Sequence, residues 1–405
     1  MDIINYVLSF NRNDYQKDNF DSFLKAIRFS FDIPVIHIAG TNGKGSTALY
    51  IKNIYKKAGL KVGLFMSPFF YSFKEMVTVN DTEITDNEIE SIINPYKKQI
   101  EKYDLSSFEI QTFLAYKHFQ NQNVDIAIIE CGMGGEIDAT NIVENELSII
   151  TSISLEHTSF LGRTISEIAL QKAGILTPGK RALIGDLNEE AINVISSICR
   201  SDRISLKSVN KFANENLKNN ELLFTYLPFV ELKIKSIADY SIKDACLAIE
   251  AVQIMKDKFP VSEENIRDGL YDINIPFRAE IISDKPTVII DGGHNPEAIE
   301  NLSKCIEIYA QNRVIHVIFA CFRDKNIQRM LDSLSLLSSD VTLTTFDHPR
   351  ARTEEEYFLF GADYQFNPDY MAAIKEKMSQ YPDDIILVTG SLAFVSFVKK
   401  DFFAQ

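Results

Sequence analysis

The stretch VIHIAGTNGKGST, residues 35–47, decides the fold of this chain. Its apolar start, Val35 to Ala39, has the length and composition of a buried strand, and a glycine-rich loop containing Lys44 follows directly. A helix comes next, because apolar residues recur at three- and four-residue spacings between Leu49 and Ala58. Gly59 then supplies a residue that tolerates the left-handed conformation of a helix C-cap.

A strand, a glycine loop and a helix in this order are typical of a polyphosphate-binding site. Glycines allow backbone N–H groups to converge on phosphate oxygens, and the helix N-terminus adds a partial positive charge. Lys44 is placed to reach the β- and γ-phosphates, although the usual pattern has Ser or Thr directly after the lysine, and here Gly45 precedes Ser46. A tight strand-to-helix turn without a ligand is the alternative interpretation.

Length, charge and cysteine content limit the classes to which this protein can belong. The 405 residues predict two domains, and 45% hydrophobic residues exclude disorder. A net charge of −14 argues against nucleic acid or an anionic membrane as a partner. The five cysteines and six histidines form no spaced clusters, which argues against disulfides and structural zinc. Without a signal-like N-terminus or a spanning apolar stretch, we expect a cytoplasmic monomer whose partners are small molecules.

Polar residues with metal-binding chemistry follow three of the predicted strands. Ser67 ends the strand from Val62, Glu130 ends the strand from Val124, and His157 follows the strand from Leu147. In a doubly wound, mostly parallel sheet the ligand binds at the carboxyl ends of the strands, so we expect these residues to converge with the glycine loop. A carboxylate there is placed to hold Mg²⁺ against phosphates. The alternatives are an exposed strand-end charge for Glu130 and a satisfied loop histidine for His157.

The pattern changes twice further along the chain. Residues 202–237 contain short strands and an Asn219-Asn220 turn, which predicts a small β insertion. After Pro276 the alternation of strands and helices restarts with the strand at Thr287, so we predict two domains, 1–276 and 277–405. The fold class is therefore α/β: a P-loop domain with a β insertion, followed by a smaller Rossmann-like α/β domain. The aromatic stretch at 68–81 is either a packed loop and hairpin or a substrate-covering loop.

Many ordered motifs together resemble the folylpolyglutamate synthase and dihydrofolate synthase family of Mur-type ATP-dependent amide ligases. The resemblance covers nearly the whole chain. The motifs that carry it are GTNGKGS, SP followed by FKE, SFE, ECGMGGEIDATN, EHTSFLGRTISEIA, KAGI, the arginine of IPFRAE, DGGHNP, DKN and GSLAFV.

The resemblance implies a role for each matched position. It implies catalytic roles for Lys44, His157 and Lys172, and an N6-carboxylated side chain at Lys172. The magnesium ligands it implies are Ser67, Glu130 and His157. The ATP-binding residues it implies are Thr41, Asn42, Gly43, Lys44, Gly45, Ser46, Asp244, Arg278, Asp291 and His294. The residues it implies for the substrate loops are Phe69, Phe73, Glu109, Glu136 and Asp138.

Several positions depart from the family pattern. Phe69 stands where many relatives have His, Glu136 where many have Arg, and Asp244 at the nucleotide-contacting Asn; Glu156 and Gln171 replace a common Asp and Glu. The N-terminal segment that meets the pterin in bifunctional members is not evident. None of these departures removes a residue that binds phosphate or metal. With Phe69 and Glu136 at these positions, the chain resembles family members that chiefly extend folate.

The activity implied is addition of L-glutamate to the γ-carboxylate of tetrahydrofolate through an acyl phosphate, with ATP as co-substrate and Mg²⁺ as cofactor. Dihydropteroate is a second substrate to consider. We expect the domains to close during turnover. The alternatives are a P-loop phosphotransferase, a catalytically silent ATP-binding regulator and a Mur-type ligase that acts on a non-folate acid. A requirement for an amine substrate distinguishes a ligase from a phosphotransferase. ATP hydrolysis coupled to amide formation excludes the silent regulator.

Overall fold

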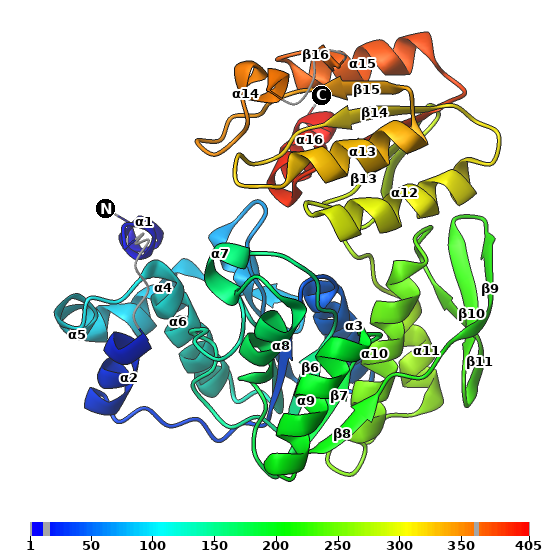
Figure 1. The fold of residues 1–405 in the computed structure, drawn as a ribbon. Coiled ribbons are helices and arrows are strands. Elements are labelled where there is room, and N and C mark those ends of the chain that lie inside the picture. Colours follow the sequence, from blue (N-terminus) through cyan, green and yellow to red (C-terminus); the bar gives the residue numbers. More distant parts are fainter. Residues whose placement is uncertain (1, 11–16, 360–363, 405) are drawn as a thin grey trace. The chain divides into compact units, whose positions relative to one another are not determined.

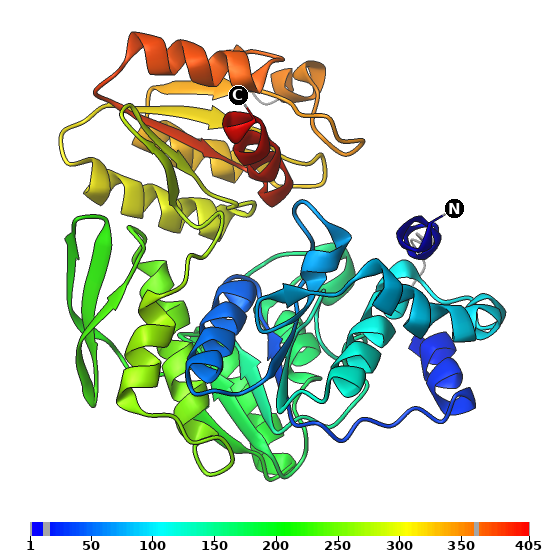
Figure 2. The same cartoon turned by 180° about the vertical axis from the view of Figure 1, so that it is seen from behind.

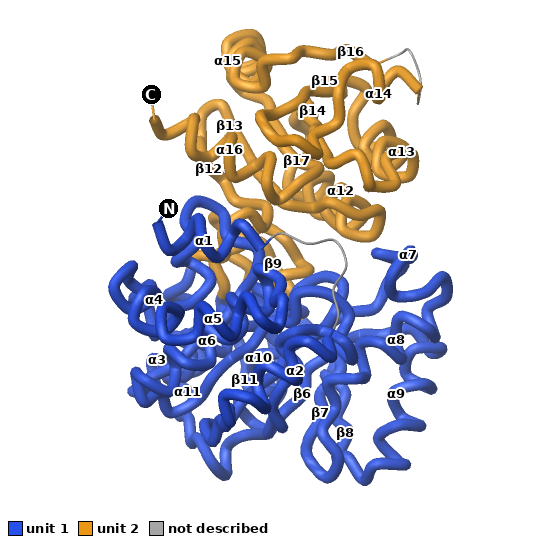
Figure 3. Tube along the Cα trace, turned by 90° about the vertical axis from the view of Figure 1, so that its left-hand side faces the viewer, with its two compact units in different colours: residues 1–213, 225–233, 243–273 blue, residues 214–224, 234–242, 274–405 orange. Residues whose placement is uncertain are grey.

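The chain folds into two compact units (Figure 3). The computed structural model describes residues 2–10, 17–359 and 364–404. Unit 1 contains residues 1–213, 225–233 and 243–273, and unit 2 contains residues 214–224, 234–242 and 274–405.

Unit 1 is built on an eight-stranded sheet with the order β4-β3-β2-β5-β1-β6-β7-β8 (Figure 1). The strands are β1 (Val35–Ala39), β2 (Val62–Phe65), β3 (Val77–Val79), β4 (Thr82–Glu83), β5 (Ile126–Glu130), β6 (Leu147–Ile150), β7 (Arg181–Ile184) and β8 (Ser205–Ser208). Neighbouring strands in the run β2-β5-β1-β6-β7-β8 pair in parallel. The β3-β4 hairpin pairs antiparallel and joins the sheet beside β2. Central β1 places Ile38 beside Glu130 of β5 and Ile149 of β6, which brings the loops after these strands to one edge.

Helices cover both faces of this sheet (Figures 1 and 2). They are α1 (Ile3–Leu8), α2 (Lys17–Ala26), α3 (Lys44–Lys57), α4 (Asp86–Ile93), α5 (Lys97–Lys102), α6 (Ser107–Gln122), α7 (Thr158–Leu161), α8 (Ile165–Ala173), α9 (Glu189–Ser201), α10 (Tyr240–Ile254) and α11 (Glu263–Tyr271), with 3₁₀ turns η1 (Phe73–Met76) and η2 (Asn94–Tyr96). Helix α3 packs on β1, β2 and β5, and α6 packs on β2 and β3. The doubly wound arrangement predicted from the sequence is confirmed. Among the described residues, no helix is long and apolar enough to cross a membrane.

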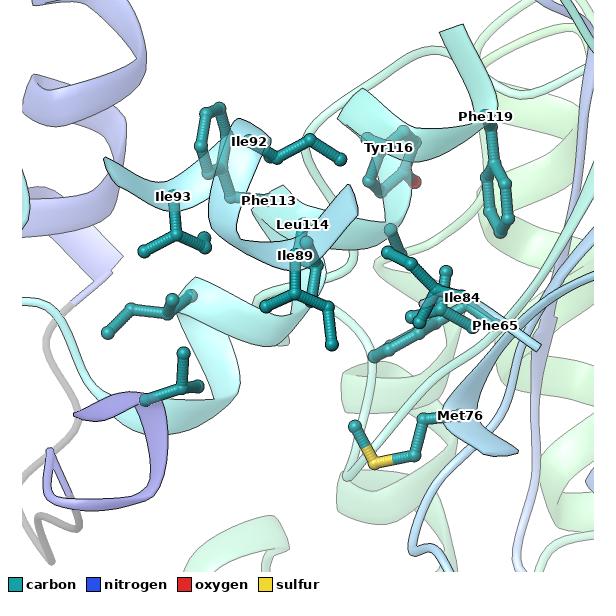
Figure 4. Packing of buried hydrophobic residues seen from close by; sticks show 14 of the residues in the cluster. Phe65, Met76, Ile84, Ile89, Ile92, Ile93, Phe113, Leu114, Tyr116 and Phe119 are labelled. Carbon is teal, nitrogen blue, oxygen red and sulfur yellow. The ribbon is translucent and has the colours of Figure 1, made fainter. Parts of the chain in front are cut away.

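Aromatic and aliphatic side chains together form the core around α6 (Figure 4). Phe113, Tyr116 and Phe119 are fully buried, and the Phe113 ring lies edge-on to Phe23 of α2 with 5.1 Å between ring centroids. Each fully buried aromatic side chain stabilises the fold by about 1.5–3 kcal/mol relative to an exposed one. This core holds β2 and β5 rigidly, so the loops that follow them have a fixed base.

The β insertion is shorter than the predicted range 202–237. Its strands are β9 (Ala213–Lys218), β10 (Glu221–Tyr226) and β11 (Phe229–Ile234), in the order β11-β10-β9. Asn219 and Asn220 both have positive φ angles, 53° and 61°, as a two-residue hairpin turn requires. Strand β8, which falls in the same stretch of sequence, instead pairs in parallel with β7 and extends the main sheet.

Unit 2 has a six-stranded sheet with the order β12-β13-β17-β14-β15-β16. Its strands are β12 (Glu280–Asp284), β13 (Thr287–Ile290), β14 (Ile315–Phe319), β15 (Asp340–Leu343), β16 (Gln365–Phe366) and β17 (Ile385–Thr389), and its helices are α12 (Pro296–Ala310), α13 (Ile327–Leu337), α14 (Glu354–Phe358), α15 (Tyr370–Gln380) and α16 (Leu392–Phe403). Only β12 among the described strands of this sheet pairs antiparallel. The predicted second α/β fold is confirmed.

Candidate active site

The glycine loop between β1 and α3 is braced by the segment that follows β6. Ser152 accepts a hydrogen bond from Thr41 N (2.9 Å) through its carbonyl and from Asn42 N (2.8 Å) through its Oγ. Thr151 Oγ1 donates to Asn42 O (2.6 Å), and Ser154 N donates to Thr41 Oγ1 (3.1 Å). Sequence reasoning missed these hydroxyl residues, although their run directly after an apolar strand, TSIS, was the available signal.

Helix α3 begins at Lys44, so its N-terminus faces the loop. Gly43 has a left-handed φ of 84°, and a Cβ at this position would lie 2.2 Å from Asp244 Oδ1. The structure therefore brings Asp244 of α10 against the loop, while its predicted contact with the nucleotide stays a prediction. Lys44 Nζ donates to Gly40 O (3.1 Å) and Thr41 O (3.2 Å). Such carbonyl contacts hold the ammonium at the loop, where incoming phosphate oxygens can replace them.

Two predicted residues meet beside the loop. Glu130 at the end of β5 is 6% exposed, and its Oε2 accepts a hydrogen bond from Ser67 N (3.3 Å). A Cβ on Gly45 would lie 3.6 Å from the same oxygen, so the glycine allows the carboxylate to approach the loop. Ser46 Oγ is buried and has no hydrogen-bond partner among the described residues. A buried carboxylate and an unsatisfied hydroxyl are oxygen donors of the kind that Mg²⁺ prefers.

His157 lies at the N-cap of α7 with a φ of 50°. Its Nε2 is 3.8 Å from Glu156 Oε1, and its side chain is 40% exposed. The imidazole therefore remains accessible to a ligand.

Lys172 is a buried amine at the end of α8, 3% exposed. The pKa of Lys172 is lowered from 10.5 to about 7, chiefly by burial and secondly by the positive charge of Lys44, while Cys131, Glu156 and Asp138 act in the opposite direction. Near neutral pH a large fraction of this side chain is uncharged. An uncharged amine is a nucleophile, which an exposed lysine is not at this pH.

The loop after β5 is held by Asp138. Its carboxylate accepts hydrogen bonds from Met133 N (2.7 Å) and Thr140 N (2.9 Å), and burial raises its pKa above the ordinary 3.8. His37 of β1 supports the same loop through Thr140 Oγ1 (2.9 Å), and burial lowers its pKa to about 3, so it is neutral. In this conformation Asp138 orders the loop.

Glu136, in the same loop, has an exposed side chain and a fixed backbone. Its N donates to Gln171 O (2.8 Å), and its carbonyl accepts a hydrogen bond from Lys17 Nζ (2.7 Å). The loop is thereby joined to the end of α8, next to Lys172, and to the start of α2. The Lys17 contact had no signal in the sequence.

The aromatic stretch after β2 is an ordered loop, the turn η1 and the β3-β4 hairpin. Phe69 is 37% exposed and Phe73 is buried, with 6.2 Å between their ring centroids. The Glu75 carboxylate accepts hydrogen bonds from the backbone N–H groups of Phe70 (3.0 Å) and Ser72 (2.8 Å), which ties the loop down. Sequence reasoning did not assign this role to Glu75.

Glu109 is buried at the start of α6. Its carboxylate accepts a hydrogen bond from Ser106 N, and the Ser106 hydroxyl accepts one from Glu109 N (3.3 Å). This reciprocal pair is a capping box, so the described contacts of Glu109 stabilise the helix end. Its predicted role in a substrate loop stays a prediction.

In unit 2, the residues predicted to bind the nucleotide lie around the loop that follows β13. Asp291 is 3% exposed, and its Oδ1 accepts a hydrogen bond from Gly293 N (2.7 Å) while its Oδ2 accepts hydrogen bonds from Ala279 N (2.8 Å) and Tyr240 Oη (2.6 Å). The sequence did not indicate this tyrosine.

Arg278 and His294 flank Asp291 in unit 2. A Cβ on Gly292 would lie 3.1 Å from Arg278 Nη1, and His294 Nδ1 lies 3.0 Å from Gly292 O. The three predicted residues of this unit thus share one loop cluster.

Comparison with known proteins defines the class first. The Mur ligase middle domain family matches residues 38–252, and the Mur ligase, glutamate ligase domain family matches residues 277–392. The chain is therefore a Mur-type ligase in its domain composition.

Relatives over the full length narrow the class. The chain is 32% identical over 389 residues to the dihydrofolate synthase/folylpolyglutamate synthase of Bacillus subtilis (strain 168), covering 91% of this chain and 90% of the relative. It is 31% identical over 383 residues to the folylpolyglutamate synthase of Lacticaseibacillus casei, covering 90% and 89%. A solved FPGS-AMPPCP-folate complex matches with a TM-score of 0.88 at 28% identity, over 99% of this chain and 100% of that one. The chain belongs to the folylpolyglutamate synthase family.

Proposed function

We propose that this chain is an ATP-dependent ligase that adds L-glutamate to the γ-carboxylate of tetrahydrofolate. The observation that carries the proposal is that, in a chain of this family, the Glu130 carboxylate lies against the glycine loop and the buried Lys172 interacts with Lys44 and has a pKa of about 7. The relatives named above carry folylpolyglutamate synthase in their names, and a matched structure contains folate.

The reaction needs activation because a carboxylate is a poor electrophile. A γ-carboxylate oxygen of the folate attacks the γ-phosphorus of ATP, the bond to the bridging oxygen breaks, and ADP leaves. The glutamate nitrogen then attacks the acyl carbon, phosphate leaves as the C–O bond breaks, and the nitrogen loses a proton. Lys44, the loop N–H groups and the N-terminus of α3 stabilise the charge that spreads over the γ-phosphate oxygens.

Glu130 and Ser67, which lie beside the loop, have the chemistry of magnesium ligands, and His157 is proposed to join them. Glu130, Ser67 and His157 would hold the ion, and Ser46 Oγ is a further oxygen donor without a partner among the described residues. Within the described ranges no three His, Cys, Asp or Glu side chains gather as a metal cluster, so hydroxyl and phosphate oxygens would complete the coordination. When bound there, Mg²⁺ would neutralise part of the charge on the transferring phosphoryl group.

Lys172 suits the N6-carboxylated form proposed for it. Carboxylation requires a neutral amine, and burial gives Lys172 a pKa of about 7. The modified side chain would present a carboxylate near the magnesium site. The positive charge of Lys44 would stabilise this negatively charged carboxylate.

Nucleotide binding would also involve Asp244, Arg278, Asp291 and His294. Asp244 approaches the glycine loop in unit 1, as the 2.2 Å distance to a Cβ on Gly43 indicates. In unit 2 the Asp291 carboxylate accepts three hydrogen bonds from its own chain, so we propose that it orders the loop and that Arg278 supplies the cation.

Product analysis tests the proposal. The enzyme is incubated with ATP, L-glutamate and either tetrahydrofolate or dihydropteroate, and products are identified by mass. We expect tetrahydrofolate lengthened by one or more glutamates, with one ADP and one phosphate released per amide. Release of phosphate without an amide, or a stable phosphorylated product that forms without glutamate, contradicts the ligase assignment. A lengthened product from dihydropteroate alone would assign dihydrofolate synthase activity, which the Bacillus subtilis relative also carries in its name.

A further inference from the structure

The turn that carries Arg278 has a strained backbone. Phe277 and Ala279, on either side of the arginine, have left-handed φ angles of 59° and 43°. Residues with a Cβ rarely adopt this conformation, and it persists only where the surroundings hold it. The direction of the Arg278 side chain therefore depends on what fixes this turn.

One set of hydrogen bonds fixes the turn from the β13 side. Ala279 N donates to Asp291 Oδ2 (2.8 Å), and Gly292 N donates to Phe277 O (2.9 Å). Tyr240 Oη donates to the same carboxylate oxygen of Asp291 at 2.6 Å. These contacts involve the loop already assigned to nucleotide binding.

A second set comes from the last helix of the chain. Glu280 Oε2 accepts a hydrogen bond from Phe277 N (3.0 Å), and Glu280 Oε1 accepts one from Lys399 Nζ of α16 (2.6 Å). The ammonium of Lys399 also lies 5.3 Å from the centre of the Phe277 ring. The side chains of Lys399 and Glu280 are only 23% and 10% exposed, so solvent screens this pair weakly.

The two contacts of Lys399 act on one residue. Glu280 holds the Phe277 N–H, and the ammonium holds the Phe277 ring by a cation–π interaction. Removal of Lys399 ends the cation–π contact with the ring and takes away the ammonium that holds the Glu280 carboxylate in place for the Phe277 N–H. The left-handed conformation at Phe277 then loses its support on this side.

We propose that Lys399 is a positioning residue for nucleotide binding: with Glu280 it clamps the strained turn and so aims Arg278. The inference rests on the proposed function only in taking Arg278 as a nucleotide contact. Lys399 itself does not touch substrate in this scheme. Its effect is transmitted through Glu280 and Phe277, about 120 residues earlier in the chain.

The test compares Lys399→Met with Lys400→Met. Lys400 is the next residue of α16 and is exposed, so its variant removes the same charge without touching the clamp. We expect Lys399→Met to raise the KM for ATP and the Kd for ATP at least about fivefold with a smaller change in kcat, because ground-state nucleotide binding is lost. Lys400→Met should match the wild type, and Lys399→Arg should recover most of the affinity. Equal ATP affinity in Lys399→Met and Lys400→Met overturns the proposal.

A double-mutant cycle separates positioning from general damage. If Lys399 acts through Arg278, Lys399→Met should weaken ATP binding little further once Arg278→Met is present. Additive effects overturn the proposal. Glu280→Gln, which keeps an acceptor for Phe277 N and loses the charge, should show a milder form of the same defect, and an ATP affinity in Glu280→Gln equal to the wild type also counts against the clamp.

Hydrogen exchange keeps the clamp testable whatever the substrate is. Amides of Phe277 and Ala279 should exchange faster in Lys399→Met than in Lys400→Met, since both are hydrogen-bonded in the clamped turn. Unchanged exchange in this segment contradicts the clamp. A wild-type enzyme that binds ATP and forms no folate amide contradicts the proposed substrate and leaves the clamp measurements valid.

Discussion

Burial gives Lys172 a chemistry that an exposed lysine lacks. Its pKa falls from 10.5 to about 7 chiefly because the charged form loses its hydration at the end of α8. The unfolded chain restores the ordinary pKa. Between about pH 7 and pH 10.5 the unfolded chain therefore binds one more proton at this residue than the folded chain.

We expect Lys172 to reduce stability most at low pH. The contribution of this residue to the free energy of unfolding is lowest below about pH 7 and rises as the pH approaches 10.5. Lys172→Met removes the titration and keeps the apolar volume, so the variant should be more stable than the wild type near about pH 6 and lose that advantage near about pH 10. Thermal unfolding of both proteins in bicarbonate-free buffer measures this. A difference in Tm that does not change with pH contradicts the expectation.

Lys44 should matter for activity far more than for folding. Its ammonium contacts the carbonyls of Gly40 and Thr41, and loss of these hydrogen bonds costs about 1 kcal/mol of stability. The same ammonium is proposed to stabilise the transferring phosphoryl group, so Lys44→Ala should lower kcat by at least about a hundredfold. Turnover and the unfolding midpoint are measured on one preparation. Retention of more than about a tenth of the activity would remove Lys44 from the phosphate site.

Glu130 is expected to act through its charge. Glu130→Gln keeps the shape of the side chain and an acceptor for Ser67 N, but it removes a negative charge from the proposed magnesium site. The magnesium concentration for half-maximal activity should rise and kcat should fall by about two orders of magnitude or more. A magnesium titration of the wild type and the variant decides the point. Superimposable titration curves would show that Glu130 is not a ligand.

At the scale of elements, much of the architecture could be predicted because buried parallel strands are apolar runs. Strands β1 and β13 begin at Val35 and Thr287, as the sequence indicates, and α3 follows the glycine loop as expected. The helical stretch after β4 is divided into α4, η2 and α5, since Pro95 has no N–H to continue the helix. Strand β8 escaped prediction because SLKS is short and mostly exposed, so its pairing with β7 leaves no apolar pattern.

The two ends of α3 offer a matched pair of glycine variants. Gly43 and Gly59 lie at the two ends of α3 with the same φ of 84°, so an alanine at either position costs about 1 kcal/mol in backbone strain. A Cβ on Gly43 would also lie 2.2 Å from Asp244 Oδ1, whereas a Cβ on Gly59 has nothing within 4 Å. We expect Gly43→Ala to weaken ATP binding at least about tenfold and Gly59→Ala to leave it unchanged. Calorimetric titration with ATP measures both. A similar loss of affinity in the two variants would assign the effect to stability alone.

At the scale of the whole chain, the sheet topology predicts which site residues lie close together, but it does not predict the individual hydrogen bonds that hold them. Parallel strands β2, β5 and β1 end at one edge, so Ser67, Glu130 and the glycine loop had to be neighbours. Asp291 and Tyr240 are 51 residues apart, and Lys399 and Glu280 are 119 apart. Single hydrogen bonds over such separations leave no periodic signal in one sequence, which is why the supports of Arg278 emerge only from the folded chain.

Substrate choice is a property of several loops together. Dihydropteroate presents an aminobenzoate carboxylate to the γ-phosphate, whereas a folate presents a flexible glutamate γ-carboxylate, so the two place different lengths of molecule in the same site. Phe69 is an aromatic residue that is 37% exposed, and Glu136 is an exposed anion; both stand at positions that the family resemblance of the sequence marks as departures. Among the described residues, Lys17 contacts the loop of Glu136, and its ammonium is already engaged by Glu136 O. Fewer donors are therefore available to steer the shorter substrate.

We predict that kcat/KM favours tetrahydrofolate over dihydropteroate by at least about tenfold, or about 1.4 kcal/mol of differential transition-state binding. A misplacement of about 1 Å at the reacting carboxylate is enough to cause a loss of this size. The double variant Phe69→His/Glu136→Arg introduces hydrogen-bond donors and should raise kcat/KM for dihydropteroate more than for tetrahydrofolate. Lys17→Met is measured separately, to show what the ammonium that already contacts Glu136 O contributes. Both substrates are measured with the same enzyme preparation and saturating ATP. Equal efficiency on the two substrates in the wild type would show that other residues steer the pterin, while the ligase assignment would stand.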